Sequence, residues 1–174
     1  DYLRELLKLE LQAIKQYEKL RQTGDELVQA FQRLREIFDK GDDDSLEQVL
    51  EEIEELIQKH RQLASELPKL ELQAIKQYRE ALEYVKLPVL AKILEDEEKH
   101  IEWLKEAAKQ GDQWVQLFQR FREAIDKGDK DSLEQLLEEL EQALQKIREL
   151  TEKTGRKILE DEEKHIEWLE TILG

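Results

Sequence analysis

The string KILEDEEKHIEWL occurs twice in this chain of 174 residues, at 92–104 and at 157–169. In each copy a Glu and a His are separated by two residues, so their side chains lie on the same face of a helix. Apolar residues recur around them at the three- and four-residue spacing of an amphipathic helix. The two Glu-x-x-His motifs are Glu97 with His100 and Glu162 with His165.

A second string, KLELQAIKQY, also occurs twice, at residues 8–17 and 69–78. It places a single Glu, Glu10 or Glu71, inside an apolar stripe. Two Glu-x-x-His helices and two single-Glu helices supply the ligand set known from carboxylate-bridged dimetal sites in four-helix bundles. Any one of these residues alone could be explained by a position on the protein surface. Burying a carboxylate without a partner costs several kcal/mol, however. Four Glu residues at core positions therefore favour a metal site. Carboxylates with two imidazoles suit Fe, Mn, Co or Zn.

The apolar pattern predicts an all-α fold, an elongated antiparallel four-helix bundle with up-down-up-down topology and coiled-coil-like packing. Each expected helix has about 40 residues and a length of about 60 Å. Gly41 and Gly128 are expected to end helices, and Ser45 and Ser132, each followed three residues later by Gln, are expected to begin the next ones as capping boxes. Pro88 is tolerated in a first helical turn.

Two helix breakers, Pro68 and Gly155, lie inside expected helices and are 87 residues apart. The same offset aligns residues 27–63 with residues 114–150. Pro68 removes one helical hydrogen bond, and a mid-helix Gly weakens a helix. We expect a junction here between two stacked segments that share one set of helices.

The composition excludes several classes of function. The chain has no Cys, so it forms neither a disulfide nor a thiolate metal site. Its formal net charge of −15 argues against nucleic acid or an anionic membrane as a partner. No membrane-spanning stretch and no signal peptide is visible. We expect a soluble monomer that stays in the cytoplasm of an expressing cell.

The repeats resemble those of the de novo designed "due ferri" di-iron proteins. The resemblance implies a dimetal-binding segment formed by residues 1–18, 69–104 and 156–174, with Glu10 and Glu71 as the bridging carboxylates. The implied metal ligands are Glu10, Glu71, Glu97, His100, Glu162 and His165. The implied supporting hydrogen bonds come from Asp96, Asp161, Tyr17 and Tyr78. Access for water and small substrates is implied at Ala13 and Ala74, for which simple core packing is the alternative.

The other half of the chain carries a second signal. His60 continues an inward-facing row of apolar residues, although a core His is more often a hydrogen-bonded structural residue than a ligand. Gly24 and Gly111 are core positions at about the same height, and two mid-helix Gly residues facing the interior leave a void. A flat void bounded by one imidazole suits a metalloporphyrin. The expected lining is Leu27, Phe31, Leu56, Leu63, Trp114 and Phe118.

Residues from about 19 to 63 and from about 107 to 150 resemble a designed four-helix bundle that binds an abiological zinc porphyrin. The resemblance implies a porphyrin-binding segment formed by residues 19–68 and 105–155. The likeness includes KLRQTGDELVQAFQRLREIFDKGDDDSLEQ at 19–48. It implies that His60 is the axial ligand of a synthetic zinc porphyrin, with natural haem as an alternative. Thr23 is expected to accept the free ring N–H of His60, unless it merely precedes Gly24 in a polar helical turn.

Together these patterns predict a de novo two-domain protein that binds a dimetal centre of Fe, Zn or Mn and a metalloporphyrin, with allosteric coupling between the sites. The alternative is an O₂-dependent di-iron oxidase of the ferroxidase or phenol oxidase type, with phenols as substrates. In that case the porphyrin segment is a redox or photochemical partner. The metal discriminates between the two, because Zn²⁺ has no redox chemistry.

Overall fold

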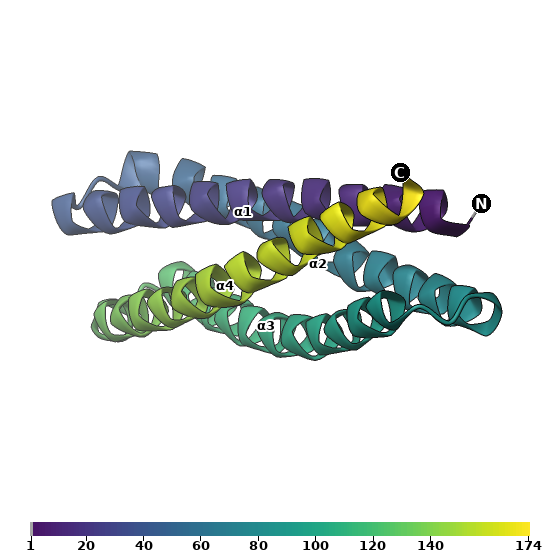
Figure 1. Cartoon of the computed structure of the whole chain (residues 1–174). Helices are drawn as coiled ribbons and strands as arrows, with labels where there is room; N and C mark the ends of the chain where they lie inside the picture. Colours follow the sequence, from purple (N-terminus) through teal and green to yellow (C-terminus); the bar gives the residue numbers. More distant parts are fainter. Residues whose placement is uncertain (1) are drawn as a thin grey trace.

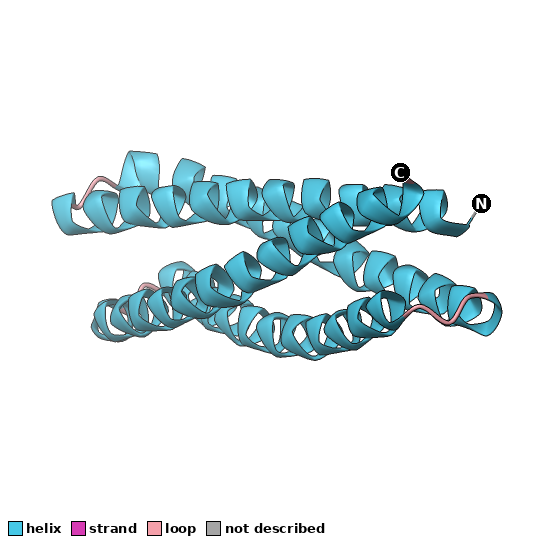
Figure 2. Ribbon diagram, viewed as in Figure 1, coloured by secondary structure: helices cyan, strands magenta, loops and turns pink. Residues whose placement is uncertain are grey.

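A computed structural model, which describes residues 2–174, consists of four long helices joined by short loops (Figures 1 and 2). No strand occurs in this described range, so the predicted all-α fold is confirmed. Asp1, which the expected dimetal-binding segment includes, lies outside the described residues. The helices are α1 (Tyr2–Lys40), α2 (Asp43–Tyr84), α3 (Pro88–Lys127) and α4 (Lys130–Leu173).

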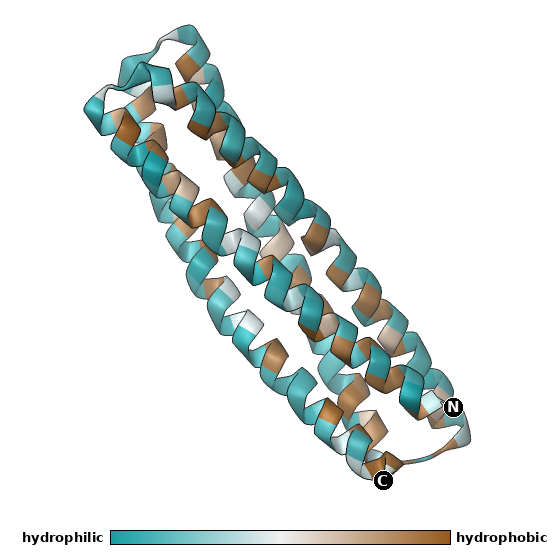
Figure 3. Cartoon of the chain, turned by 90° about the horizontal axis from the view of Figure 1, so that it is seen from above, coloured by the Kyte–Doolittle hydropathy of each residue, from teal (hydrophilic) through white to brown (hydrophobic). Residues whose placement is uncertain are grey.

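The helices form an elongated bundle in which each packs on its two neighbours, in the cyclic order α1, α2, α3, α4. Within residues 2–174, the backbones of the diagonal pairs α1–α3 and α2–α4 do not approach each other, although Phe31 and Phe38 of α1 contact Trp114 and Phe121 of α3 across the interior. Both termini and the α2–α3 loop lie at one end of the bundle, and the other two loops lie at the opposite end (Figure 3). The up-down-up-down topology follows. None of the described helices has an apolar stretch long enough to cross a membrane.

The predicted helix ends at Gly41 and Gly128 are confirmed, because both residues have φ of 70°. This left-handed conformation is strained for residues with a Cβ, and Gly adopts it freely. Pro88 occupies the first turn of α3, as predicted, after an N-cap at Leu87 that makes no side-chain capping bond.

The predicted capping boxes at Ser45 and Ser132 are wrong. The N-caps are Asp42 and Asp129, whose carboxylates each accept a hydrogen bond from the backbone N–H of the Ser three residues later, at 3.3 Å. Asp is as good an N-cap as Ser, so the helix begins at the earlier of the two candidates. Each Ser therefore lies inside the first turn.

Three apolar clusters fill the interior, and polar layers separate them. The first lies at the end with the termini, and its fully buried members include Leu6, Tyr78, Leu90 and Leu169. The second is a small middle cluster of Tyr17, Leu67 and Ile158. The third and largest lies toward the two Gly loops and is drawn from residues 27–57 and 114–144. The buried polar residues are Glu10, Thr23, Glu71, Glu97, His100, Glu162 and His165.

Between the middle and the largest cluster the bundle is poorly filled. No residue is fully buried from 101 to 113 in α3 or from 145 to 157 in α4, and none from 58 to 66 in α2. α2 nevertheless continues through Pro68, and α4 continues through Gly155. This under-packed band is therefore spanned by unbroken helices.

Gly155 gives a first test of this packing. A Cβ at this position meets no atom within 4 Å, so Gly155→Ala should stabilise the unligated protein by about 1 kcal/mol through helix propensity. Gly128→Ala is the matched control and should destabilise it, because φ at Gly128 is 70°. Urea denaturation measures both changes, and a loss of stability in Gly155→Ala would show that α4 is tightly packed there.

Candidate functional site

Six predicted ligand side chains from all four helices meet in one layer, and each is at most 1% exposed. Glu10 comes from α1, Glu71 from α2, and one Glu-x-x-His motif from each of α3 and α4. Their ligand atoms form two groups, and within each group the atoms lie within 4.8 Å of one another. The first group is Glu10, Glu97, Glu162 and His165, and the second is Glu71, Glu97, His100 and Glu162.

The geometry places Glu97 and Glu162, rather than Glu10 and Glu71, between the two groups. Glu97 and Glu162 belong to both groups, whereas Glu10 and Glu71 belong to one each. Glu97 lies between the two imidazoles, with its carboxylate 3.6 Å from His100 Nδ1 and 3.2 Å from Nδ1 of the His on α4. Glu97 precedes His100 by three residues, so the two side chains lie on the same face of α3. The Glu97 carboxylate is therefore close to both imidazoles.

Two aspartates fix the orientation of the imidazoles. The Nε2 of His100 lies 2.9 Å from Asp161 Oδ2, and the Nε2 of His165 lies 2.9 Å from Asp96 Oδ2. Each Nε2–H donates to a carboxylate of the other helix, so Nδ1 of each ring points into the cluster. An imidazole held in this way presents a lone pair on Nδ1 to a cation.

Unsatisfied buried atoms show that the cluster fits metal ions. Both carboxylate oxygens of Glu71, Glu97 and Glu162 are buried without a hydrogen-bond partner, as is one oxygen of Glu10. His100 Nδ1 lies 3.0 Å from Glu162 Oε1, yet no hydrogen bond joins them. Such atoms destabilise a fold unless something compensates them. Two divalent cations would satisfy them all.

Without cations the cluster holds protons. Burial raises the pKa of Glu162 to about 8. Burial also acts to raise the pKa of Glu97, but the adjacent imidazoles of His100 and His165 outweigh it and lower that pKa. Burial would lower the pKa of His165, but the adjacent carboxylates of Glu97 and Asp96 raise it instead. Metal binding must therefore displace protons.

The two tyrosines differ in their hydrogen bonding. Tyr78 donates a hydrogen bond to Glu10 Oε1 at 2.7 Å, whereas the hydroxyl of Tyr17 is buried without a partner. The expected hydrogen bond from Tyr17 to a ligand is absent from the described residues. Burial raises the pKa of both hydroxyls. Ala13 and Ala74 are each 4% exposed, so both lie in the interior.

Two tryptophans were missed by the sequence analysis. The ring of Trp103 lies 5.6 Å from that of His100, and the ring of Trp168 lies 5.8 Å from that of His165. Both follow their His by three residues within the repeated string, and this spacing would have revealed them. Trp103 also packs against the middle apolar cluster, and Trp168 packs against the cluster at the end with the termini.

The second polar layer joins α1 to α2. Thr23 Oγ1 donates to the carbonyl of Leu20 at 2.9 Å and lies 3.0 Å from His60 Nδ1. A hydroxyl has one proton, so Nδ1–H of His60 must be the donor to Thr23. Burial lowers the pKa of His60, which favours the neutral ring. Nε2 therefore carries a free lone pair, and no side chain among residues 2–174 hydrogen-bonds to it.

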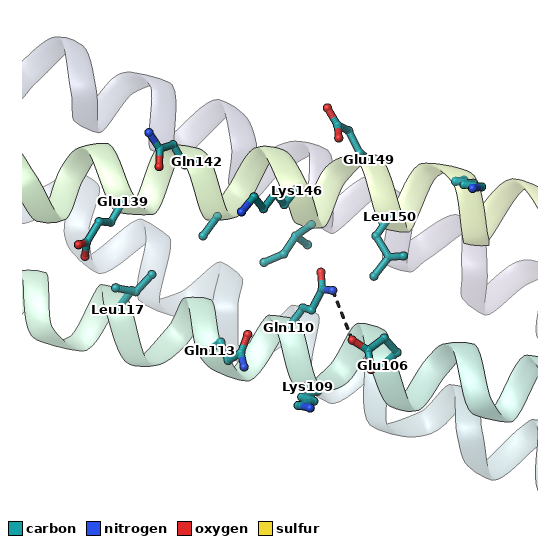
Figure 4. Close-up of a pocket in the computed structure, with 13 residues that line it drawn as sticks. Glu106, Lys109, Gln110, Gln113, Leu117, Glu139, Gln142, Lys146, Glu149 and Leu150 are labelled. Carbon is teal, nitrogen blue, oxygen red and sulfur yellow. Dashed lines mark hydrogen bonds between the residues drawn. The ribbon is translucent and has the colours of Figure 1, made fainter.

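Two glycines and two surface grooves lie in this half of the bundle, but His60 itself lines neither groove. A Cβ on Gly24 would lie 3.7 Å from His60 Cε1, and a Cβ on Gly111 meets no atom within 4 Å. Two open grooves flank α4 along the under-packed band. One has a volume of about 740 Å³ and lies between α3 and α4 (Figure 4). The other has a volume of about 620 Å³ and lies between α1 and α4.

The expected lining only partly matches these grooves. Leu27, Phe31, Trp114 and Phe118 are buried in the largest apolar cluster, and only Phe31 among them borders a groove. Trp114 is anchored there by donating from Nε1 to the carbonyl of Leu140 at 3.1 Å. Leu56 and Leu63 are half-buried. The open walls instead belong largely to α4, including Ala143, Ile147 and Leu150.

These features define the class of protein as a four-helix bundle with buried carboxylate and imidazole groups suited to metal ions. The chain is 68% identical to the protein in "NMR structure of holo-PS1", with 78% of this chain and 95% of that chain covered and a TM-score of 0.54. It is 69% identical to "NMR structure of apo-PS1", with 79% and 96% covered and a TM-score of 0.50. The chain therefore belongs to the PS1 family. No protein-family model and no curated protein matches it.

The raised pKa of Glu162 predicts a dependence of stability on pH. Between its ordinary value of 4.5 and about 8, the unfolded chain loses this proton while the folded chain keeps it. The metal-free protein should therefore lose stability as the pH rises through this range. Urea denaturation in the presence of a chelator measures the effect.

Glu162→Gln should flatten this profile, because the substituted side chain does not titrate. Zinc-saturated protein should also show no such loss, since the ions hold the carboxylate ionised. A metal-free protein that gains stability from about pH 5 to about pH 8 would contradict the assigned protonation.

Proposed function

We propose that this chain is an engineered two-site protein that binds a dinuclear divalent-metal centre and a metalloporphyrin. The observation that carries the metal site is the pair of overlapping buried groups, each with one imidazole held in place by an Asp. Glu97 and Glu162 would bridge the ions, and Glu10 and Glu71 would each hold one. Iron or manganese would supply redox chemistry there, whereas zinc would supply charge alone.

The porphyrin would occupy the under-packed band. His60 Nε2 is the proposed axial ligand, supported by the hydrogen bond that places the ring proton on Nδ1. Gly24, Gly111 and the grooves beside α4 would supply room for a flat ligand. The titles of the PS1 structures distinguish a holo and an apo form of that protein. Their similarity over 78% of this chain supports a bound group here as well.

The two sites would divide the chain into residues 1–18, 69–104 and 156–174 for the metals and residues 19–68 and 105–155 for the porphyrin. Only the small cluster of Tyr17, Leu67 and Ile158 separates the two polar layers. The same four helices run through both. Filling the under-packed band would order the helices that also carry the metal ligands, so we propose that the sites are coupled.

Metal titration tests the bridging assignment. The native chain should bind two Zn²⁺ ions, and Glu97→Gln should weaken both by more than about 100-fold, since even indirect partners of a metal contribute 10–100-fold. Glu71→Gln should leave one ion tightly bound. Glu98→Gln is the matched control, because Glu98 is exposed and pairs with Arg79. A Glu97→Gln variant that retains one tight ion would contradict the shared position.

Absorption spectroscopy with a zinc porphyrin tests the second site. His60→Ala should abolish the axial-ligation shift of the main band and leave Zn²⁺ binding at the Glu/His cluster intact. Thr23→Val should weaken porphyrin binding by about 10- to 100-fold, because the ring loses its orienting partner, while Thr23→Ser should retain binding. A ligated spectrum that persists in His60→Ala would show that the porphyrin is held elsewhere.

Coupling is tested by titrating Zn²⁺ with and without the zinc porphyrin. We expect the zinc affinity to change by about fivefold, which corresponds to a coupling free energy of about 1 kcal/mol. By linkage the porphyrin affinity must change by the same factor when zinc is present. Superimposable isotherms in both experiments would show two independent sites.

A further inference from the structure

The hydroxyl of Tyr17 is an unused hydrogen-bond donor close to the Glu/His layer. The residue is 6% exposed, and its oxygen is buried without a hydrogen-bond partner among residues 2–174. A buried hydroxyl without a partner destabilises a fold. Burial, and to a smaller extent the negative charge of Glu97, raise the pKa of Tyr17, so the hydroxyl keeps its proton and remains a donor.

Tyr17 and Tyr78 end the two copies of KLELQAIKQY, each seven residues after the single Glu of its copy. Long side chains on a helix lean back toward the N-terminus of that helix, so each tyrosine leans toward the Glu/His layer. Tyr78 reaches Glu10 Oε1 at 2.7 Å. Tyr17 makes no such bond, and both carboxylate oxygens of Glu71 lack a partner. The same repeated string therefore gives two unequal halves of the site.

The sequence around the two copies explains why the halves differ. The residue just before the string is Leu7 in α1 but Pro68 in α2. Proline removes one helical hydrogen bond and crowds the preceding turn. Tyr78 also lies in the apolar cluster at the end with the termini, whereas Tyr17 lies in the small middle cluster next to the under-packed band. The tyrosine in the less filled surroundings is the one without a partner.

Tyr17 lies on the same side of the Glu/His layer as His100. The ring of His100 lies 5.6 Å from that of Trp103, and Trp103 packs against the middle cluster that contains Tyr17. The adjacent group of potential ligands is Glu71, Glu97, His100 and Glu162. Four protein ligands leave open positions on an ion that prefers octahedral coordination, such as Mn²⁺.

We propose that Tyr17 donates a hydrogen bond to a small exogenous ligand on the metal ion held by Glu71 and His100. The ligand would be water at rest, and a small anion such as azide would replace it. Two divalent cations balance the four carboxylate charges of the layer, so an anion meets no net negative charge there. The ion at Glu10 would lack this donor, because Tyr78 is already bonded to Glu10. This inference rests on the proposed dinuclear metal site.

Azide titration of the Co²⁺-loaded protein, followed by visible absorption, tests the proposal. Tyr17→Phe should weaken azide binding by about 10- to 100-fold, because a hydrogen bond to a charged ligand is lost. Tyr84→Phe is the matched control, since Tyr84 is 71% exposed, and it should leave the azide affinity unchanged. Equal azide affinity in Tyr17→Phe and the native chain, or no azide binding by the native chain, overturns the proposal. A chain that does not hold two Co²⁺ ions overturns the metal site as well.

Urea denaturation of the metal-free protein tests the free hydroxyl by itself. Tyr17→Phe removes a buried hydroxyl without a partner and should stabilise the protein, whereas Tyr78→Phe breaks the bond to Glu10 and should destabilise it. A loss of stability in Tyr17→Phe overturns the proposal, because the hydroxyl then has a partner within the fold. A Tyr17→Phe variant that binds Co²⁺ more weakly and azide as tightly as the native chain also overturns it, because the hydroxyl then serves Glu71.

Discussion

Four carboxylates and two imidazoles share one buried layer of an otherwise apolar interior, and the rest of the structure accommodates this layer. Most of their inward-facing oxygens lack a hydrogen-bond donor, so the layer destabilises the bundle unless cations or protons neutralise it. The Asp96 and Asp161 carboxylates hold the imidazoles with Nδ1 inward, and apolar clusters close the layer toward the chain termini and toward the middle of the bundle. Rigid placement of unsatisfied ligands is what makes a metal site selective and strong.

The second polar layer, which contains Thr23 and His60, differs from the Glu/His layer because it is partly exposed to solvent and poorly packed. One hydrogen bond, from His60 to Thr23, selects the tautomer of a single imidazole. At this level α2, α3 and α4 each contribute no buried side chain over nine or more residues. Interiors normally fill such space. A fold that leaves such space open gives up stability unless something fills it.

Much of this could be predicted from the sequence because helical periodicity specifies which residues share a layer. The helix ends at Gly41 and Gly128 and the convergence of six ligand side chains follow from spacing alone. The N-cap residues could not be predicted from spacing, since Asp42 and Ser45 are equally good candidates and only the local backbone conformation selects one. Periodicity also leaves open which oxygens lie nearest each other, so it did not reveal that Glu97 and Glu162 belong to both groups. The unpaired hydroxyl of Tyr17 depends on small helix displacements that no pattern encodes.

The most direct test of the central claim is anomalous diffraction from crystals of the zinc-loaded protein. The account predicts two zinc peaks about 3.5–4 Å apart, the spacing of two-metal sites. Each ion should be bound by Nδ1 of one imidazole, and the carboxylates of Glu97 and Glu162 should contact both. A single peak in this layer, or two ions bridged by Glu10 and Glu71 instead, would contradict it.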